Sequence, residues 1–295
     1  MIGEFIHTVV SMTVPILLAA LGGLFTDLSG ILNIGLEGMM LSSCFFSVLA
    51  ADMTGSVVVG VLSGIAISTA FAGITAFLGI KLRANIFVAG LATNLMSAGL
   101  TVFLSSTLLG SKGTVTFTSF EPLSRLQIPL LNDLPLLGRA LSGYNILEYL
   151  AFALVIITYF VVFKTPYGYH LQTVGKNPET ARSVGISVEK HIVLSFLLSG
   201  VFCGLAGAAL SLPMRVFVGG MSSGRGWIAL VAVVLGRGNP LGVLVASLIF
   251  GAASALSNLL QAVTNLSADL LLTIPFFVTL TSMVVYAMRK QVKHD

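Results

Sequence analysis

Most of this chain consists of apolar segments that are each about as long as a lipid bilayer is thick. A helix needs about 20 mostly apolar residues to cross the hydrocarbon core. Hydrophobic residues make up 56% of the chain and charged residues only 9%, so we predict an all-α polytopic membrane protein with about 9–10 transmembrane segments. The predicted segments are 8–26, 30–51, 56–80, 85–109, 145–163, 192–214, 226–236, 241–262 and 269–288.

The polar stretches between these segments predict one membrane domain over 1–295 with two longer loops. The loop 111–143 precedes the fifth segment, and the loop 164–191 follows it. Alternation of the segments places ten of the 15 Lys and Arg residues on the side of 164–191, and such residues accumulate on the cytoplasmic side. We therefore expect 164–191 and the C-terminus inside, and 111–143 and the N-terminus outside. Segment 226–236 is too short to cross and suits a half-helix or re-entrant element.

Composition and missing motifs exclude several functions for the chain itself. The net charge of +4 does not indicate nucleic-acid binding, because basic residues at the ends of membrane helices set orientation. The sequence has no G-x-x-x-x-G-K-[ST] loop for ATP phosphates and no His/Cys cluster with metal spacing. We expect no catalytic residue, metal or cofactor in this chain, so energy for any transport comes from a partner or an ion gradient.

Two parts of the sequence resemble one another. GVLSGIAISTAFAGI (60–74) is similar to GVLVASLIFGAASAL (242–256), and a glycine-punctuated stretch precedes each of them, 29–40 and 225–236. The predicted topology gives the two units opposite orientations, as in an inverted repeat with a substrate path at its interface. The alternative is that patterns of Gly, Ala and Ser recur because small residues let membrane helices pack closely.

A carboxylate stands inside the second apolar segment, in FTDLSGILNIGLEGMML (25–41). Asn33 and Glu37 are four residues apart and would share one face of a helix. An ionised carboxylate in a bilayer is costly unless it is paired or hydrated, so Glu37 marks a pair, a cavity or a helix terminus. Two interpretations remain open. Glu37 pairs with an Arg and holds the bundle together, or it contacts the substrate.

Three further residues are candidates for lining a substrate path. Thr93 and Asn94 interrupt the apolar run FVAGLATNLMSAGL, and polar groups at that depth must face protein or water. Trp227, the only tryptophan, lies between Arg225 and Arg237. It is either an interfacial anchor or an aromatic wall for a ring-bearing substrate. The predicted path residues are Asn33, Glu37, Thr93, Asn94 and Trp227.

The loop KTPYGYHLQTVGKNPETARSVGISVEKH (164–191) contains the signals of a short helix. Asn177 is a predicted N-cap with Pro178 at the first helical position, and Glu179 is in the first turn, where its charge suits the helix dipole. Gly185 ends the helix after about two turns. A solvated loop does not need a capped and terminated helix, so we predict that 178–184 docks into another protein.

Three ordered motifs indicate a family. LSGILNIGLEGMML, VGKNPETARSVGI and GWIALVAVVLGRGNPLG together resemble the permease subunits of bacterial ATP-binding-cassette importers for simple sugars, branched-chain amino acids and nucleosides, and the first motif is most similar to the nucleoside branch. The resemblance covers residues 14–288 and implies that two permeases pair, that ATPases dock below them, and that an extracytoplasmic lipoprotein delivers substrate. One departure is Thr26-Asp27-Leu28, where members often have two charged residues.

The resemblance also implies a role for the short helix, which corresponds to the coupling helix that rests on the ATPase. The matching residues here are Gly175, Asn177, Pro178, Glu179, Ala181, Arg182 and Gly185. We therefore expect a permease for nucleosides in the bacterial cytoplasmic membrane, in contact with membrane lipid, an ATPase that carries ATP and Mg, and a second, longer permease. The alternatives are a sugar or branched-chain amino acid permease of the same type, an ion-coupled secondary transporter, and a non-transporting scaffold.

Overall fold

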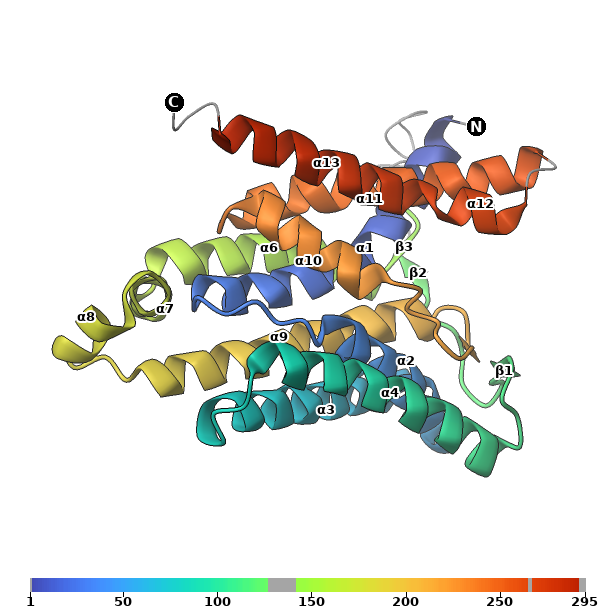
Figure 1. The fold of residues 1–295 in the computed structure, drawn as a ribbon. Coiled ribbons are helices and arrows are strands. Elements are labelled where there is room, and N and C mark those ends of the chain that lie inside the picture. Colours follow the sequence, from blue (N-terminus) through green and yellow to red (C-terminus); the bar gives the residue numbers. More distant parts are fainter. Residues whose placement is uncertain (1, 127–141, 265–266, 292–295) are drawn as a thin grey trace.

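The computed structural model describes residues 2–126, 142–264 and 267–291, and this part of the chain is a helical bundle (Figure 1). Seven of its helices are long and apolar enough to cross a membrane. These helices are α1 (Ile2–Leu28), α2 (Leu36–Thr54), α3 (Val57–Ala76), α4 (Ile86–Leu109), α6 (Ile146–Lys164), α9 (Val188–Ser211) and α11 (Pro240–Val263). The predicted all-α polytopic fold is confirmed.

Shorter elements complete the described bundle. A π-helical turn, η1 (Phe77–Lys81), extends α3, and the other short helices are α7 (Pro166–Lys176), α8 (Pro178–Ser183), α10 (Arg225–Gly236), α12 (Ala268–Leu272) and α13 (Ile274–Gln291). Strand β1 (Val115–Thr116) pairs with β4 (Val216–Phe217), and β2 (Arg125–Leu126) pairs with β3 (Tyr144–Asn145), both antiparallel. The strands lie at the opposite end of the bundle from α7 and α8 (Figure 1). Residues 127–141 of the predicted loop 111–143 are outside the described part.

Helix α4 has the polarity expected of a helix that faces lipid. Its buried positions include Thr93, Ser97, Thr101 and Ser105, which recur every fourth residue and so form one stripe. Large apolar side chains such as Phe87, Leu95 and Phe103 are exposed on the other side. Hydroxyl groups in a bilayer must find partners inside the protein, so this arrangement is the reverse of a helix in a water-soluble protein.

The helices pack in the pattern expected of the predicted repeat. Helix α3 packs on α9 as α11 packs on α1, and α2 packs on α9 as α10 packs on α1. Glycines allow the closest approaches. A Cβ on Gly204 would lie 2.5 Å from the Cα of Ile65 in α3, and a Cβ on Gly251 would lie 2.9 Å from the Cα of Thr13 in α1. The sequence pairs 60–74 and 242–256 therefore occupy equivalent positions in two interlocked units.

Several predicted boundaries differ from the structure. Helix α2 begins at Leu36, not at 30, and the segment 29–35 is non-helical, with Gly30 at a φ of +86°. The predicted span 269–288 is divided between α12 and α13 at Thr273. Helix α7 lies in what was predicted to be loop, where Thr165 caps it and Pro166 begins it. Segment 226–236 is short as predicted, because α10 has 12 residues.

Candidate functional site

The start of α10 is held by a side chain of another helix. Glu37 lies in the first turn of α2, and its Oε1 accepts hydrogen bonds from the Ser222 hydroxyl at 2.6 Å and the Gly224 amide at 2.9 Å. Its Oε2 accepts from the Gly226 amide at 2.7 Å. The first amides of a helix have no partner within the helix and carry a partial positive charge. Glu37 therefore caps α10 from outside.

The groups that hydrogen-bond to Glu37 are not those of the predicted Arg. The described bonds to this carboxylate come from a serine and two backbone amides. Arg225 instead donates through Nη1 to the carbonyl oxygens of Met221 and Ser222. The unpaired amides at a helix start satisfy a buried carboxylate as well as a guanidinium does. The sequence predicts the short segment 226–236 but does not show that its first turn lies against Glu37.

The start of α2 is capped in the same manner, by Asn94 of α4. The Asn94 Oδ1 accepts from the Gly38 amide at 2.7 Å, and its Nδ2 donates to the Ile34 carbonyl at 2.9 Å. The Ser97 hydroxyl donates to the Gly38 carbonyl at 2.6 Å. A Cβ at position 38 would lie 2.7 Å from the Asn94 Cα, so only glycine permits this approach. The long helix α2 and the short helix α10 thus both begin inside the bundle, and each is capped by a different helix.

Two of the predicted path residues are fully enclosed by protein. Asn33 is 1% exposed and lies in the non-helical segment before α2, so it does not share a helical face with Glu37. Its Nδ2 donates to the Ser199 hydroxyl at 2.9 Å. Thr93 is 3% exposed, and its hydroxyl is 2.8 Å from that of Thr75. The structure shows both residues in polar contacts between helices, and their contact with substrate stays a prediction.

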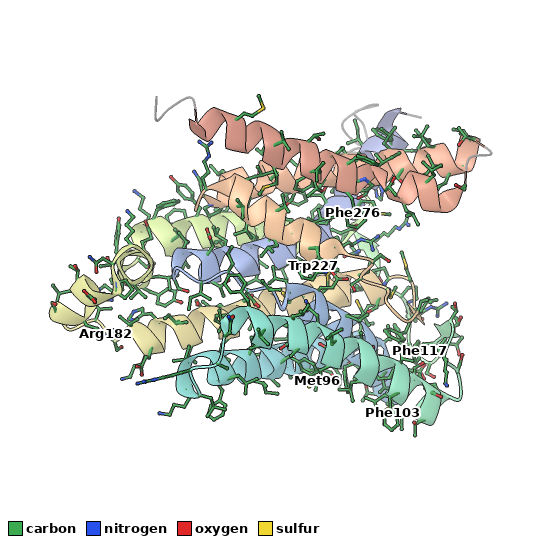
Figure 2. The ribbon with its side chains drawn as sticks, in the orientation of Figure 1. Met96, Phe103, Phe117, Arg182, Trp227 and Phe276 are labelled. Atoms are coloured by element: carbon green, nitrogen blue, oxygen red, sulfur yellow. The ribbon has the colours of Figure 1, made fainter. Side chains whose placement is uncertain are left out.

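Trp227 directly follows the last residue that Glu37 caps, and its side chain is 40% exposed. Figure 2 shows it near the middle of the bundle, well away from Arg182 at the α8 end. Phe276 of α13 lies against the start of the same helix, because a Cβ on Gly224 would be 2.9 Å from its ring. Of the five predicted path residues, Trp227 is the most exposed.

The short helix of the polar loop forms as the sequence predicts. In α8 the Asn177 Oδ1 accepts from the amides of Glu179 and Thr180 at 3.1 and 3.0 Å, and Pro178 is the first helical residue. Gly185 follows the helix with a φ of +84°. Ala181 is fully buried against Val174 and Val188. Glu179 and Arg182 are exposed on the other side of α8, and Figure 2 shows Arg182 at the end of the bundle.

Gly175 has a different position from the predicted one. It belongs to the last turn of α7 and packs against the end of α1, where a Cβ would lie 2.8 Å from the Gly30 amide nitrogen. The backbone of α7 therefore touches the start of the segment 29–35, which leads directly to Glu37. This contact joins the α8 end of the molecule to the starts of α2 and α10.

Tyr167 of α7 is a half-buried residue with a buried hydroxyl that the sequence did not single out. Its hydroxyl has no hydrogen-bond partner among the described residues, and burial raises its pKa to about 12. Its ring stacks on that of His191, with 5.8 Å between the centroids. Tyr169, two residues later, donates to the Phe163 carbonyl at 2.6 Å. The pair offers a direct comparison of a bonded and an unbonded hydroxyl.

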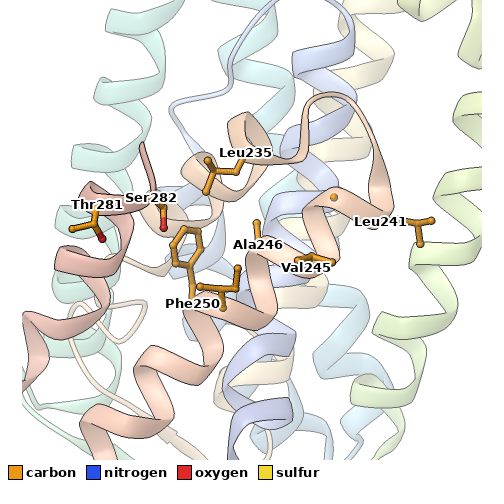
Figure 3. A pocket seen from close by; sticks show the side chains of 9 residues that line it. Leu235, Leu241, Val245, Ala246, Phe250, Thr281 and Ser282 are labelled. Atoms are coloured by element: carbon orange, nitrogen blue, oxygen red, sulfur yellow. The ribbon is translucent and has the colours of Figure 1, made fainter. Parts of the chain in front are cut away.

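An apolar groove of about 660 Å³ runs between α10, α11 and α13 (Figure 3). Leu235, Val245 and Phe250 are among the apolar residues that line it, and the hydroxyls of Thr281 and Ser282 lie at one side. None of the residues that line it is charged. Among the described residues, no group of three or more His, Cys, Asp or Glu side chains could hold a metal ion.

Comparison with known proteins identifies relatives over most of the chain. Residues 5–288 match the family model described as branched-chain amino acid transport system / permease component. The chain is 35% identical to the guanosine ABC transporter permease protein NupQ of Bacillus subtilis, over 91% of this chain and 87% of that protein. It is 34% identical to the nucleoside ABC transporter permease protein NupC of Lactococcus lactis, over 82% and 78%. The putative glucose ABC transporter permease protein TsgC13 of Haloferax volcanii is also 34% identical, over 85% and 76%.

Proposed function

The chain belongs to the branched-chain amino acid transport system / permease component family, and from that premise we propose that it is the transmembrane permease subunit of an ATP-driven importer of nucleosides. The observation that carries the substrate class is the 35% identity to a guanosine permease over 91% of the chain. ATP and Mg bind to a separate ATPase. The chain supplies the helices that line the path and the surface on which the ATPase docks.

The docking surface is the exposed side of α8. Its backbone is fixed by the Asn177 cap and by the burial of Ala181, so Glu179 and Arg182 project from a defined helix. A rigid charged helix beyond the bundle suits a cleft in a partner protein. This placement puts the α8 end and the C-terminus in the cytoplasm and the N-terminus outside, as the distribution of Lys and Arg favours.

The path runs beside the starts of α2 and α10. Discontinuous helices whose first turns meet at membrane depth are typical of substrate sites in transporters. Glu37 and Asn94 hold those first turns in position, and Trp227 presents its ring beside one of them. An aromatic ring at this place suits a base that passes by, and weak contact suits a transport path better than tight binding.

The importer contains further subunits. A second, longer permease completes the membrane part, and an extracytoplasmic lipoprotein captures the nucleoside. Affinity purification of the tagged chain from its native membrane tests this composition. An ATPase, a second permease and a lipoprotein should copurify in fixed ratio, whereas recovery of the chain without any ATPase would contradict the proposal.

A second candidate function is glucose import. It is favoured by the 34% identity to the glucose permease relative. Both functions need the same subunits, so composition does not separate them. Competition does, because an excess of unlabelled guanosine should abolish uptake of a labelled nucleoside and an equal excess of glucose should leave it unchanged.

A further inference from the structure

The turn between α3 and α4, residues 77–88, carries all the charge of this helix pair. Lys81 and Arg83 are the only charged residues between 57 and 109, where no Asp or Glu occurs. Residues 81–85 are all exposed. The turn lies at the same end of the bundle as α8, and α8 extends beyond it (Figure 1). The pair of cations therefore lies at one end of an otherwise uncharged helical hairpin.

Arg83 has a left-handed backbone in this turn, with a φ of +53°. The π-helical turn η1 precedes it, in which the Leu82 amide donates to the Phe77 carbonyl at 3.2 Å and the Ala84 amide donates to the Leu78 carbonyl at 3.0 Å. Glycine usually occupies the left-handed position after a helix, because a Cβ makes that conformation unfavourable. An arginine there indicates that its side chain makes a contact which offsets the strain.

The other described non-glycine residues with a positive φ have partners. Arg215 donates through Nη1 to a backbone carbonyl at 3.1 Å, the Ser223 hydroxyl donates to another at 3.3 Å, and Arg237 also has a partner. The structure gives no hydrogen bond or ion pair from the side chain of Arg83 or Lys81 to a described residue. The contact that offsets the strain at Arg83 is therefore missing from the described part of the chain, and a partner outside the chain would supply it.

The apolar neighbours of the two cations indicate what that partner is. Phe77, Leu82 and Phe87 are all more than half exposed, and they continue the exposed apolar side of α4. Such side chains belong in the hydrocarbon of a bilayer. Lys and Arg beside an apolar surface of this kind extend their charged groups to the membrane interface, where lipid phosphates lie.

We propose that the α3–α4 turn binds an anionic phospholipid of the leaflet at the α8 end. The Arg83 guanidinium and the Lys81 ammonium donate to phosphate oxygens of the headgroup, and the guanidinium can do so through two parallel bonds. Phe77 and Phe87 lie along the acyl chains. The absence of carboxylates from 57–109 leaves the attraction of the two cations unopposed within the hairpin. The inference does not depend on the transported substrate, so it can fail while the proposed function stands.

A fluorescent label on the turn tests the contact in the assembled importer in phosphatidylcholine nanodiscs. The Ala84→Cys variant carries the label at an exposed position, whereas the native Cys44 and Cys203 are buried. Spin-labelled phosphatidylglycerol should quench the label about threefold more than the same amount of spin-labelled phosphatidylcholine. The difference should vanish at about 1 M salt, where charges are screened within about 3 Å, and excess inorganic phosphate should not remove it. Equal quenching by the two lipids, or no quenching by either because the ATPase covers the turn, would overturn the proposal.

Variants of Arg83 separate the charge from the backbone. Arg83→Gly combined with Lys81→Gln should abolish the preference for phosphatidylglycerol, and Arg83→Lys should retain part of it. Lys112→Gln, which removes an exposed charge at the other end of the bundle, should retain all of it. In detergent without anionic lipid, Arg83→Gly should melt no lower than the parent, because glycine adopts this φ without strain. A preference that survives the double substitution would contradict the proposal. So would a lower apparent Tm of Arg83→Gly in detergent, because it would show that the Arg83 side chain has its partner within the protein.

Discussion

Glu37 combines a costly position with a complete set of partners. A carboxylate at membrane depth is tolerated only when protein or water satisfies it, and here three donors from the start of α10 do so. The same three donors would otherwise be orphaned at a helix start inside the bundle. Each group thus removes the cost of burying the other, and the helix dipole adds to the attraction.

Substituting Glu37→Gln should destabilise the protein. The charge-assisted bonds are lost, and the new amide N–H groups face backbone donors. We expect the free energy of unfolding to fall by about 2 kcal/mol or more, measured as a lower apparent Tm in detergent. Glu189→Gln, in the exposed first turn of α9, is the matched control and should change little. Equal apparent Tm values for the two variants would contradict the capping role.

Tyr167→Phe should have the opposite effect on stability and raise the free energy of unfolding. Its hydroxyl is buried without a partner among the described residues, so its removal relieves an uncompensated desolvation. The expected gain is about 1 kcal/mol in the free energy of unfolding. Tyr169→Phe removes the 2.6 Å bond to the Phe163 carbonyl and should be neutral or destabilising. Thermal melts of the two variants side by side decide the matter, and a loss of stability for Tyr167→Phe would show that its hydroxyl is bonded in the protein.

Some helix boundaries could be predicted from the sequence and others could not. The boundaries of α8 were predictable because Asn177, Pro178 and Gly185 act through their own backbone neighbours. The start of α2 was not, because 29–35 is an apolar run whose open conformation depends on Asn33 and Ser199, residues 166 positions apart. Helix α7 was missed, although Thr165 and Pro166 are an N-cap and first-turn pair that could have revealed it.

The contact between α2 and α10 depends on a glycine. A Cβ on Gly226 would lie 2.5 Å from the backbone of Glu37, so Gly226→Ala should separate the two helix starts and break the carboxylate bonds. We expect a loss of about 2 kcal/mol or more, with reduced transport. Gly99→Ala is the control, because a Cβ there meets nothing within 4 Å, and it should gain up to about 1 kcal/mol from helix propensity. Equal melting behaviour of the two alanine variants would disprove the close packing.

The exposed side of α8 is tested by charge removal. Arg182→Ala and Glu179→Ala should lower substrate-stimulated ATP hydrolysis of the assembled importer by about tenfold, because docking through α8 transmits the ATPase motion. Both residues are exposed and support no buried contact, so the chain should stay folded. Lys112→Ala, an exposed cation at the other end of the bundle, should have no effect. Unchanged stimulation in both α8 variants would place the docking surface elsewhere.

At the scale of the whole molecule, one chain of contacts connects the α8 end with the starts of α2 and α10. Helix α7 touches the end of α1 through Gly175 and Gly30, and the segment from Gly30 leads to Glu37 and so to α10. The fold class was predictable because the lengths of the apolar segments and the repeated small residues can be read directly from the sequence. The caps of α2 and α10 were not, because they join residues that are 56 to 189 positions apart.

Uptake of a labelled nucleoside by the reconstituted importer tests the central claim most directly. Proteoliposomes would contain this chain with its ATPase, second permease and binding protein, and ATP would be supplied on the ATPase side. We predict that guanosine accumulates with ATP, does not accumulate with a non-hydrolysable analogue, and is not displaced by excess glucose or leucine. Accumulation of glucose or leucine without any nucleoside, or guanosine uptake driven by a proton gradient in the absence of ATP, would contradict the proposed function.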